Sequence, residues 1–298
     1  MLHIGIIPDG NRRYARKNNI DTLEGYKIGF RKIQTIINEI YDNNGNSDNI
    51  DKIIDKNKII NNISKYNINN INNVNGITNI DEDEINRLRK NIIKCDNGYN
   101  IDEITLYICS VDNIKKRKTK DILDLMEVMY DCINEWSSEE SILYKLKIKV
   151  RIVGNVNLLP DKSLVRKIKN IARNTKKHDK LFLNLAIGYS GKDDIVNAVN
   201  KFINNNGNSK ITHNDNSKIT HNDNSKITHN DITNNMVVKR NIDLVIRTGK
   251  EKRTSGFFPW NTLYSEWFFV NKYCPEIDIY DIENVLIEYS KRERRFGK

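Results

Sequence analysis

The sequence predicts one α/β domain with a central, mostly parallel, six-stranded sheet flanked by helices. Short unbroken apolar runs alternate with longer stretches of helical periodicity, a pattern typical of strands that helices cover on both faces. The chain has 298 residues. Roughly 200 of them follow this pattern, which is enough for a single domain.

The first half of the core predicts two pairs of a strand and a helix. The apolar run at 2–7 predicts a strand, and a helical stretch from 11 to about 41 follows it. A β-branched and aromatic run at 104–109 predicts the second strand. The next helix carries apolar residues at the spacing of a buried helix face, at Ile122, Leu125, Met126 and Met129.

The second half of the core continues the alternation. Apolar runs predict four further strands, at 146–153, 181–187, 242–246 and 267–270. Helical periodicity predicts helices at 161–175 and 192–203, and a last helix that begins at 282–289. Because parallel strands need crossover connections, these intervening helices support a mostly parallel sheet.

Two stretches of the single domain, 1–298, are predicted to be low-complexity inserts, 42–100 and 205–235. The first is dominated by Asn, Ile, Asp and Lys, and Asn disfavours the interiors of both helices and strands. The second contains three tandem copies of Asn-Ser-Lys-Ile-Thr-His-Asn-Asp, a period that fits no familiar solenoid. Its histidines, at 213, 221 and 229, could in principle bind a metal, but a flexible insert is the favoured interpretation.

Composition narrows the class of protein and of partner. The net charge of +10 favours a polyanionic partner, which leaves nucleic acid, a membrane surface or a phosphorylated small molecule. No apolar run approaches the ~20 residues of a transmembrane helix, and the apolar start is too short for a signal peptide. The four cysteines form no CxxC pair, which argues against a zinc site and favours a reducing, cytoplasmic location.

The first strand leads into a segment suited to anions. Pro8-Asp9-Gly10-Asn11-Arg12-Arg13 joins the strand end to a helix start, where free backbone amides and arginines attract phosphate. Asp9 would repel a phosphate unless a cation lay between them, and Mg²⁺ commonly bridges one carboxylate and substrate phosphates. The alternative makes Asp9 a helix cap and the arginines a solvated surface.

A second basic cluster follows the fifth predicted strand. Arg247, Arg253 and Ser255 lie on a turn-rich segment, and Glu266 sits just before the last strand. Ligands of parallel sheets bind beyond the carboxyl ends of the strands. Two basic clusters at such ends, each with a carboxylate nearby, therefore predict a site for Mg²⁺ and diphosphate.

These motifs resemble those of the cis-prenyltransferases, the undecaprenyl diphosphate and dehydrodolichyl diphosphate synthases. The resemblance spans nearly the whole core, while the two inserts have no counterpart. It is carried by His3–Ala15, Thr105–Tyr107 with Ser110 and Asn113, Val150–Gly154, Leu183–Ala186 with Tyr189, Asp194–Val196, Asp243–Ser255, Trp260, Tyr264, Glu266 and the closing Arg295-Phe296-Gly297.

The resemblance implies an enzyme that lengthens an allylic diphosphate, usually farnesyl diphosphate, with isopentenyl diphosphate units in cis geometry. Such products serve as lipid carriers of the dolichol or undecaprenol type. It also implies a homodimer, with peripheral membrane contact for the long product, at the endoplasmic reticulum in a eukaryote. The implied metal ligands are Asp9 and Glu266, for Mg²⁺.

The resemblance also assigns substrate ligands and catalytic positions. Asp9, Ser110 and Asn113 match the catalytic positions. The allylic diphosphate is expected at Gly10, Asn11, Arg12 and Arg13. Isopentenyl diphosphate is expected at Arg247, Arg253 and Ser255, with Arg295 and Gly297 reaching across the dimer.

The sequence departs from the bacterial members at five positions. Tyr26 stands for His, Thr22 for Arg, Cys109 for Phe, Ile114 for Trp and Lys116 for Arg, which leaves chain-length control open. Two other classes of function compete with the enzyme. A non-catalytic partner subunit is disfavoured because both the aspartate motif and the closing Arg-x-Gly are present. Nucleic-acid binding rests only on the net charge, without a supporting motif.

Overall fold

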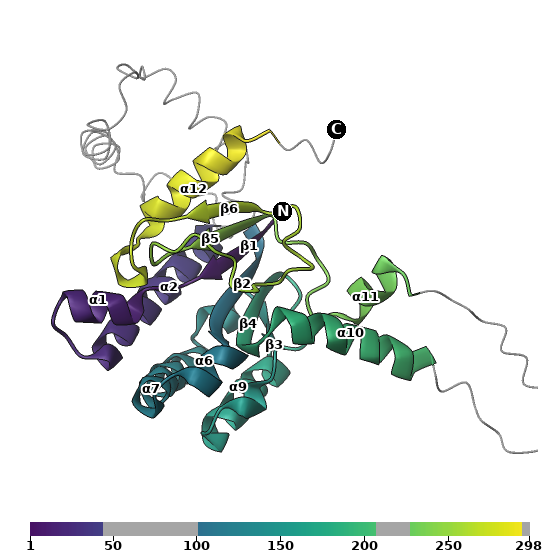
Figure 1. Ribbon diagram of the computed structural model, residues 1–298, viewed down its shortest axis with the longest axis horizontal. Helices are drawn as coiled ribbons and strands as arrows, with labels where there is room; N and C mark the ends of the chain where they lie inside the picture. Colours follow the sequence, from purple (N-terminus) through teal and green to yellow (C-terminus); the bar gives the residue numbers. More distant parts are fainter. Residues whose placement is uncertain (44–100, 207–226, 294–298) are drawn as a thin grey trace, which may run out of the picture.

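The computed structural model describes residues 1–43, 101–206 and 227–293 (Figure 1). A six-stranded sheet lies at its centre, in the order β3-β4-β2-β1-β5-β6, and each pair of neighbouring strands is parallel. The predicted α/β fold with six strands is therefore confirmed. The strands are β1 (Leu2–Ile7), β2 (Ile101–Ser110), β3 (Ile148–Val153), β4 (Leu181–Tyr189), β5 (Leu244–Arg247) and β6 (Glu266–Phe269).

Helices connect the strands, and Figure 1 shows α1, α2, α7 and α9 grouped along one side of the sheet. None of the described helices is both long and apolar enough to cross a bilayer. The helices are α1 (Asn11–Lys17), α2 (Thr22–Asn43), α6 (Val111–Lys116), α7 (Thr119–Trp136), α8 (Ile142–Lys145), α9 (Lys162–Asn174), α10 (Gly191–Asn206), α11 (His229–Asn235) and α12 (Ile279–Lys291), with short 3₁₀ turns at η3 (Val156–Leu158) and η4 (Cys274–Glu276).

The larger core lies between the sheet and several helices, α2, α7, α9 and α12. Ile33, Ile36, Ile37 and Ile40 recur at helical spacing and are at most 4% exposed. They belong to the same buried cluster as the β1 side chain Ile4. This one-sided apolar stripe explains why an isoleucine-rich segment folds as a helix against the sheet rather than as another strand.

A buried polar network crosses four strands of the sheet. Asn184 donates through Nδ2 to Glu103 at 2.7 Å and to Thr105 Oγ1 at 2.8 Å, and Arg151 donates to Glu103 at 2.8 Å. His3 Nδ1 lies 3.1 Å from the carbonyl of Asn241, so it carries the proton, and Nε2 accepts from Thr105 at 2.7 Å. Burial lowers the pKa of His3, so its neutral form belongs to the native state.

The structure divides the predicted helix from 11 to 41 into α1 and α2. Asn18 is the C-cap of α1, and Asn19 adopts a left-handed φ of 54°, which stops the helix before α2 begins at Thr22. Asn tolerates this conformation better than most residues do. The break lets α1 fold back against α2, where a Cβ at Gly25 would lie 2.8 Å from the Ala15 Cβ of α1.

The edges of the predicted inserts also differ from expectation. Most of 42–100, and 207–226 within 205–235, lie outside the described residues. The third copy of the repeat enters α11, because Thr228 and Asp231 form a capping box. Trp260 Nε1 donates to Thr233 Oγ1 at 3.0 Å, which ties α11 to the body of the domain. The last part of the predicted insert is therefore helical.

Candidate functional site

The turn after β1 is held against the loop after β5. Gly10 has a φ of 102°, and a Cβ there would lie 2.7 Å from the Tyr273 ring and 3.0 Å from the Gly249 Cα. Gly249 has a φ of 89°, and its Cβ would lie 2.9 Å from Arg13 Nη2. Both positions therefore require glycine, because backbone conformation and space each exclude a side chain. The two glycines bring the two predicted basic clusters into contact.

Asp9 lies at the centre of this contact. Its Oδ1 accepts from the Gly10 amide at 2.7 Å, and Oδ2 accepts from Arg247 Nη2 at 2.9 Å. Arg13 Nη2 lies 3.3 Å from Oδ1. The Asp9 side chain is 34% exposed, whereas that of Arg247 is only 4% exposed. Asp9 thus neutralises a buried guanidinium and still presents its carboxylate to solvent.

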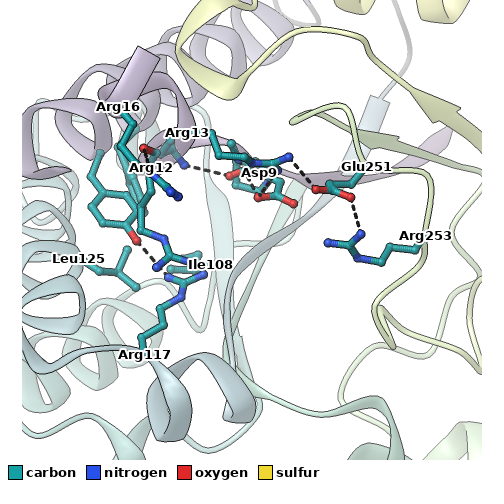
Figure 2. Close-up of a pocket in the computed structure, with 14 residues that line it drawn as sticks. Asp9, Arg12, Arg13, Arg16, Ile108, Arg117, Leu125, Glu251 and Arg253 are labelled. Atoms are coloured by element: carbon teal, nitrogen blue, oxygen red, sulfur yellow. Dashed lines mark hydrogen bonds and ion pairs between the residues drawn. The ribbon is translucent and has the colours of Figure 1, made fainter. Parts of the chain in front are cut away.

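The loop after β5 surrounds the Arg247 guanidinium with polar groups. Arg247 Nη1 donates to Ser255 Oγ at 2.8 Å and to the carbonyl of Arg253. Glu251 accepts from Arg13 Nη1 at 2.6 Å and also from Arg253 Nη1. Figure 2 shows the resulting chain of ion pairs, which runs from Asp9 through Arg13 and Glu251 to Arg253.

These groups line a cavity of about 250 Å³ at the carboxyl edge of the sheet. Its polar wall contains Asp9 and Glu251 together with Arg12, Arg13, Arg16, Arg117 and Arg253, and its apolar wall contains Tyr26, Phe30, Ile108 and Leu125 (Figure 2). A cavity with a cationic wall beside an apolar one suits an anionic head group attached to a hydrocarbon chain.

Arg117 and Tyr26 meet where the two walls join. Arg117 Nη1 donates to the Tyr26 hydroxyl at 3.1 Å. The Arg117 Nε is buried without an acceptor among the described residues. Burial raises the pKa of Tyr26, so the phenol stays neutral and leaves the Arg117 charge uncompensated. The pair therefore offers a positive charge to a ligand.

Comparison with known proteins identifies the family. The prenyltransferase family described as undecaprenyl diphosphate synthase matches residues 82–297. The chain belongs to this family. It is 32% identical over 209 residues to the tritrans,polycis-undecaprenyl-diphosphate synthase (geranylgeranyl-diphosphate specific) of Methanocaldococcus jannaschii, covering 70% of this chain and 71% of that protein.

Other relatives cover nearly the whole chain. The protein of the same name from Pyrobaculum aerophilum is 26% identical over 296 residues, covering 99% of this chain and 95% of that protein. The crystal structure of lavandulyl diphosphate synthase from Lavandula x intermedia covers 99% of this chain and 98% of its own, at a TM-score of 0.67 and 20% identity, which shows a shared fold. The chain is thus a transferase of prenyl groups.

The structure brings most of the predicted ligands of this prenyltransferase together. Asp9, Gly10, Asn11, Arg12, Arg13 and Arg253 line the cavity, and Arg247 and Ser255 support it from behind. Arg12 also donates to Asp121 at 2.8 Å. Asn11 is buried and donates to the Pro8 carbonyl at 3.0 Å, so it fixes the turn.

Ser110 and Asn113 have a structural role in the described residues. Ser110 Oγ accepts from the Asn113 amide at 2.9 Å, and Asn113 Oδ1 accepts from the Ser110 amide at 3.2 Å. This reciprocal pair caps α6, and neither residue lines the cavity. Their catalytic assignment stays a prediction that this geometry does not itself support.

Glu266 is not near Asp9 within one chain. It begins β6 and pairs with Leu244, at the amino end of β5, whereas Arg247 stands at the carboxyl end. Its carboxylate accepts from Arg292 at 2.6 Å. The first residue of a parallel strand lies at the edge opposite to the ligand site, so Asp9 and Glu266 of one chain do not form a joint metal site. Arg295 and Gly297 lie outside the described residues.

Sequence reasoning assigned no site role to three charged side chains that line the cavity, Arg16, Arg117 and Glu251. The resemblance aligned Lys116 with the family arginine, but Lys116 is 73% exposed and pairs with Asp112. Its neighbour Arg117 is the side chain that enters the cavity. Glu251 lies within the second predicted basic cluster, and its negative charge among basic neighbours was the one signal in the sequence that could have drawn attention to it.

Proposed function

We propose that the enzyme condenses isopentenyl diphosphate with an allylic diphosphate and makes a polyprenyl diphosphate. The observation that carries this proposal is the cavity, in which Asp9 and several arginines face an apolar wall of Phe30, Ile108 and Leu125. A free phosphate would leave that apolar wall uncovered. A prenyl diphosphate uses both.

Each of the two arginine groups binds one of the two substrates. Gly10, Arg12 and Arg13 bind the allylic diphosphate, with Arg117 as an additional ligand beside the apolar wall. Arg253, with Arg247 and Ser255 behind it, binds isopentenyl diphosphate. Departure of the allylic diphosphate concentrates negative charge on its oxygens, and fixed guanidinium groups stabilise that charge most as the bond breaks.

The donor set at Asp9 fits a Mg²⁺ ion that arrives with a diphosphate. Asp9 is a single carboxylate that is about one-third exposed, and no group of three potential metal-binding side chains occurs among the described residues. Mg²⁺ is commonly held by one or two carboxylates and substrate phosphates. When bound, it would neutralise charge on the leaving diphosphate. Asp9 would hold the ion, and its carboxylate is oriented by Arg247 and the Gly10 amide.

The proposed primer and product rest on the resemblance to the family. The sequence predicts farnesyl diphosphate as primer, whereas the archaeal relatives are named for geranylgeranyl diphosphate. We propose an all-trans allylic primer of one of these two lengths, and a product that serves as a lipid carrier of the dolichol or undecaprenol type. A long apolar product also supports peripheral contact with a membrane.

A homodimer is proposed because Arg295 and Gly297 match a tail that acts across a subunit interface. Mixing two inactive chains, Asp9→Ala and Arg295→Ala, tests this arrangement. If subunits share sites, mixed dimers contain one intact site and activity returns in part. Mixed dimers without activity would mean that the tail serves its own subunit.

The reaction is tested with purified protein, Mg²⁺ and labelled isopentenyl diphosphate. Farnesyl and geranylgeranyl diphosphate are compared as primers at equal concentration, and chelated samples serve as the control. Label should enter butanol-extractable product only when both primer and Mg²⁺ are present. Folded protein that incorporates no label with either primer would refute a self-sufficient synthase.

A further inference from the structure

One carboxylate stands between the two arginine groups of the cavity. Glu251 binds Arg13 through Oε1 at 2.6 Å and Arg253 through Oε2 (Figure 2). Under the proposed function, on which this inference rests, Arg13 faces the allylic diphosphate and Arg253 faces isopentenyl diphosphate. The Glu251 side chain therefore pairs with one arginine from each of the two substrate sites.

A carboxylate fixed in this place would repel the substrate diphosphates. Glu251 lines the same cavity as Asp9 and the arginines, and like charges at contact distance repel strongly where water is partly excluded. Asp9 avoids this conflict because buried Arg247 holds one of its oxygens and a metal ion can bridge the carboxylate to phosphate. The ion pairs of Glu251 in the described residues are both to arginines that the substrates need.

Glu251 can leave these arginines at low cost. Its side chain is 24% exposed, so the carboxylate already contacts water. It follows Gly249 and Lys250, which have φ values of 89° and 63°, on a loop where Lys250 and Lys252 are both exposed. A displaced Glu251 carboxylate would therefore move into solvent beside cations rather than into an apolar environment.

We propose that Glu251 is an internal anion that occupies Arg13 and Arg253 in the empty enzyme and that substrate diphosphates displace it. Its carboxylate pairs with both guanidinium groups until a substrate diphosphate arrives. After each cycle it competes with the pyrophosphate product for the same two arginines. Removal of its charge should therefore tighten diphosphate binding. A Glu251 that merely positions the arginines would give the opposite sign.

The test is calorimetric titration of inorganic pyrophosphate into the purified full chain. Glu251→Gln keeps the size of the side chain and removes its charge, and Glu251→Ala is a second variant. Glu276→Gln is the matched control, because Glu276 pairs with Lys17 nearby but does not line the cavity. We expect both Glu251 variants to lower the pyrophosphate Kd about tenfold, the scale of one charge-assisted contact, and the control to change it less than twofold.

The outcomes separate this inference from the proposed function. If wild-type protein binds pyrophosphate and Glu251→Gln binds it equally or more weakly, Glu251 is not a competitor. Equal tightening in Glu276→Gln would reduce the effect to net charge and would also overturn the inference. Weaker binding of pyrophosphate by Glu251→Gln only when Mg²⁺ is present would instead make Glu251 a metal ligand. No binding to wild type or to either Glu251 variant would overturn the diphosphate cavity itself.

Discussion

Replacement of Arg117 should selectively weaken the binding of the allylic diphosphate. In the described residues no carboxylate pairs with its guanidinium, whose Nη1 donates to neutral Tyr26 and whose Nε has no acceptor. One hydrogen bond between charged groups contributes about 1.5–3 kcal/mol. Arg117→Met should therefore raise the KM for the allylic diphosphate about 10- to 150-fold, with little change in the KM for isopentenyl diphosphate.

The assay varies each substrate while the other is saturating. Lys116→Met is the matched control, since it removes an equal charge from the next residue, which is 73% exposed and pairs with Asp112. Arg117→Lys should recover part of the affinity, because it restores charge without the planar fork. If Arg117→Met changes the allylic KM less than threefold, or if Lys116→Met matches it, then Arg117 does not bind this substrate.

Three further predictions concern catalysis, the repeats and pH. Asp9→Asn should lower kcat roughly 10³-fold or more while the protein remains folded, because an amide still contacts Arg247 but holds no Mg²⁺, and a tenth of wild-type kcat would contradict this role. Deletion of 208–223 removes two whole repeat copies and should leave melting temperature and activity unchanged, whereas deletion of 208–231 also removes the cap of α11 and should cost about 0.5–2 kcal/mol in urea unfolding. Burial lowers the pKa of His3 in the folded state, so its contribution is complete above the unfolded pKa of about 6.5 and is lost as pH falls below it; the stability difference between wild type and His3→Asn should shrink over that range, and a difference independent of pH would refute the assignment.

Strand prediction succeeded where burial on both faces left a simple signal. The run 2–7 is a strand with the predicted bounds, and 181–187 falls within β4. The β4 run contains Asn184, whose amide is buried in the network with Glu103 and Thr105. One polar residue did not interrupt the apolar pattern, because its hydrogen bonds are satisfied by neighbouring strands.

The helix bounds and the positions of some predicted site residues differ from expectation where position along an element mattered more than residue type. The Asn18-Asn19 pair could have marked the end of α1, since Asn favours the left-handed conformation that the structure shows at Asn19. Glu266 was expected just before a strand, and that position already placed it at the amino edge, away from Asp9. Arg117 rather than Lys116 enters the cavity because α6 ends at Lys116. A shift of one residue in the end of this helix would change which side chain faces the cavity, and the sequence does not predict helix ends that closely.

The register between β1 and β5 determines whether Asp9 and Arg247 can meet. Ile7 pairs with Arg247, and a slip of one residue would turn Arg247 to the opposite face of the sheet. The amino end of this pairing is fixed by Asp243, whose Oδ2 accepts from the His3 amide at 2.8 Å and whose amide donates to the His3 carbonyl at 2.9 Å. At the other end, Thr248 Oγ1 donates to the Asp9 carbonyl at 2.8 Å. Side chains at both ends of a four-residue strand therefore hold Arg247 against the Asp9 carboxylate, and this explains how so short a strand can carry a buried arginine.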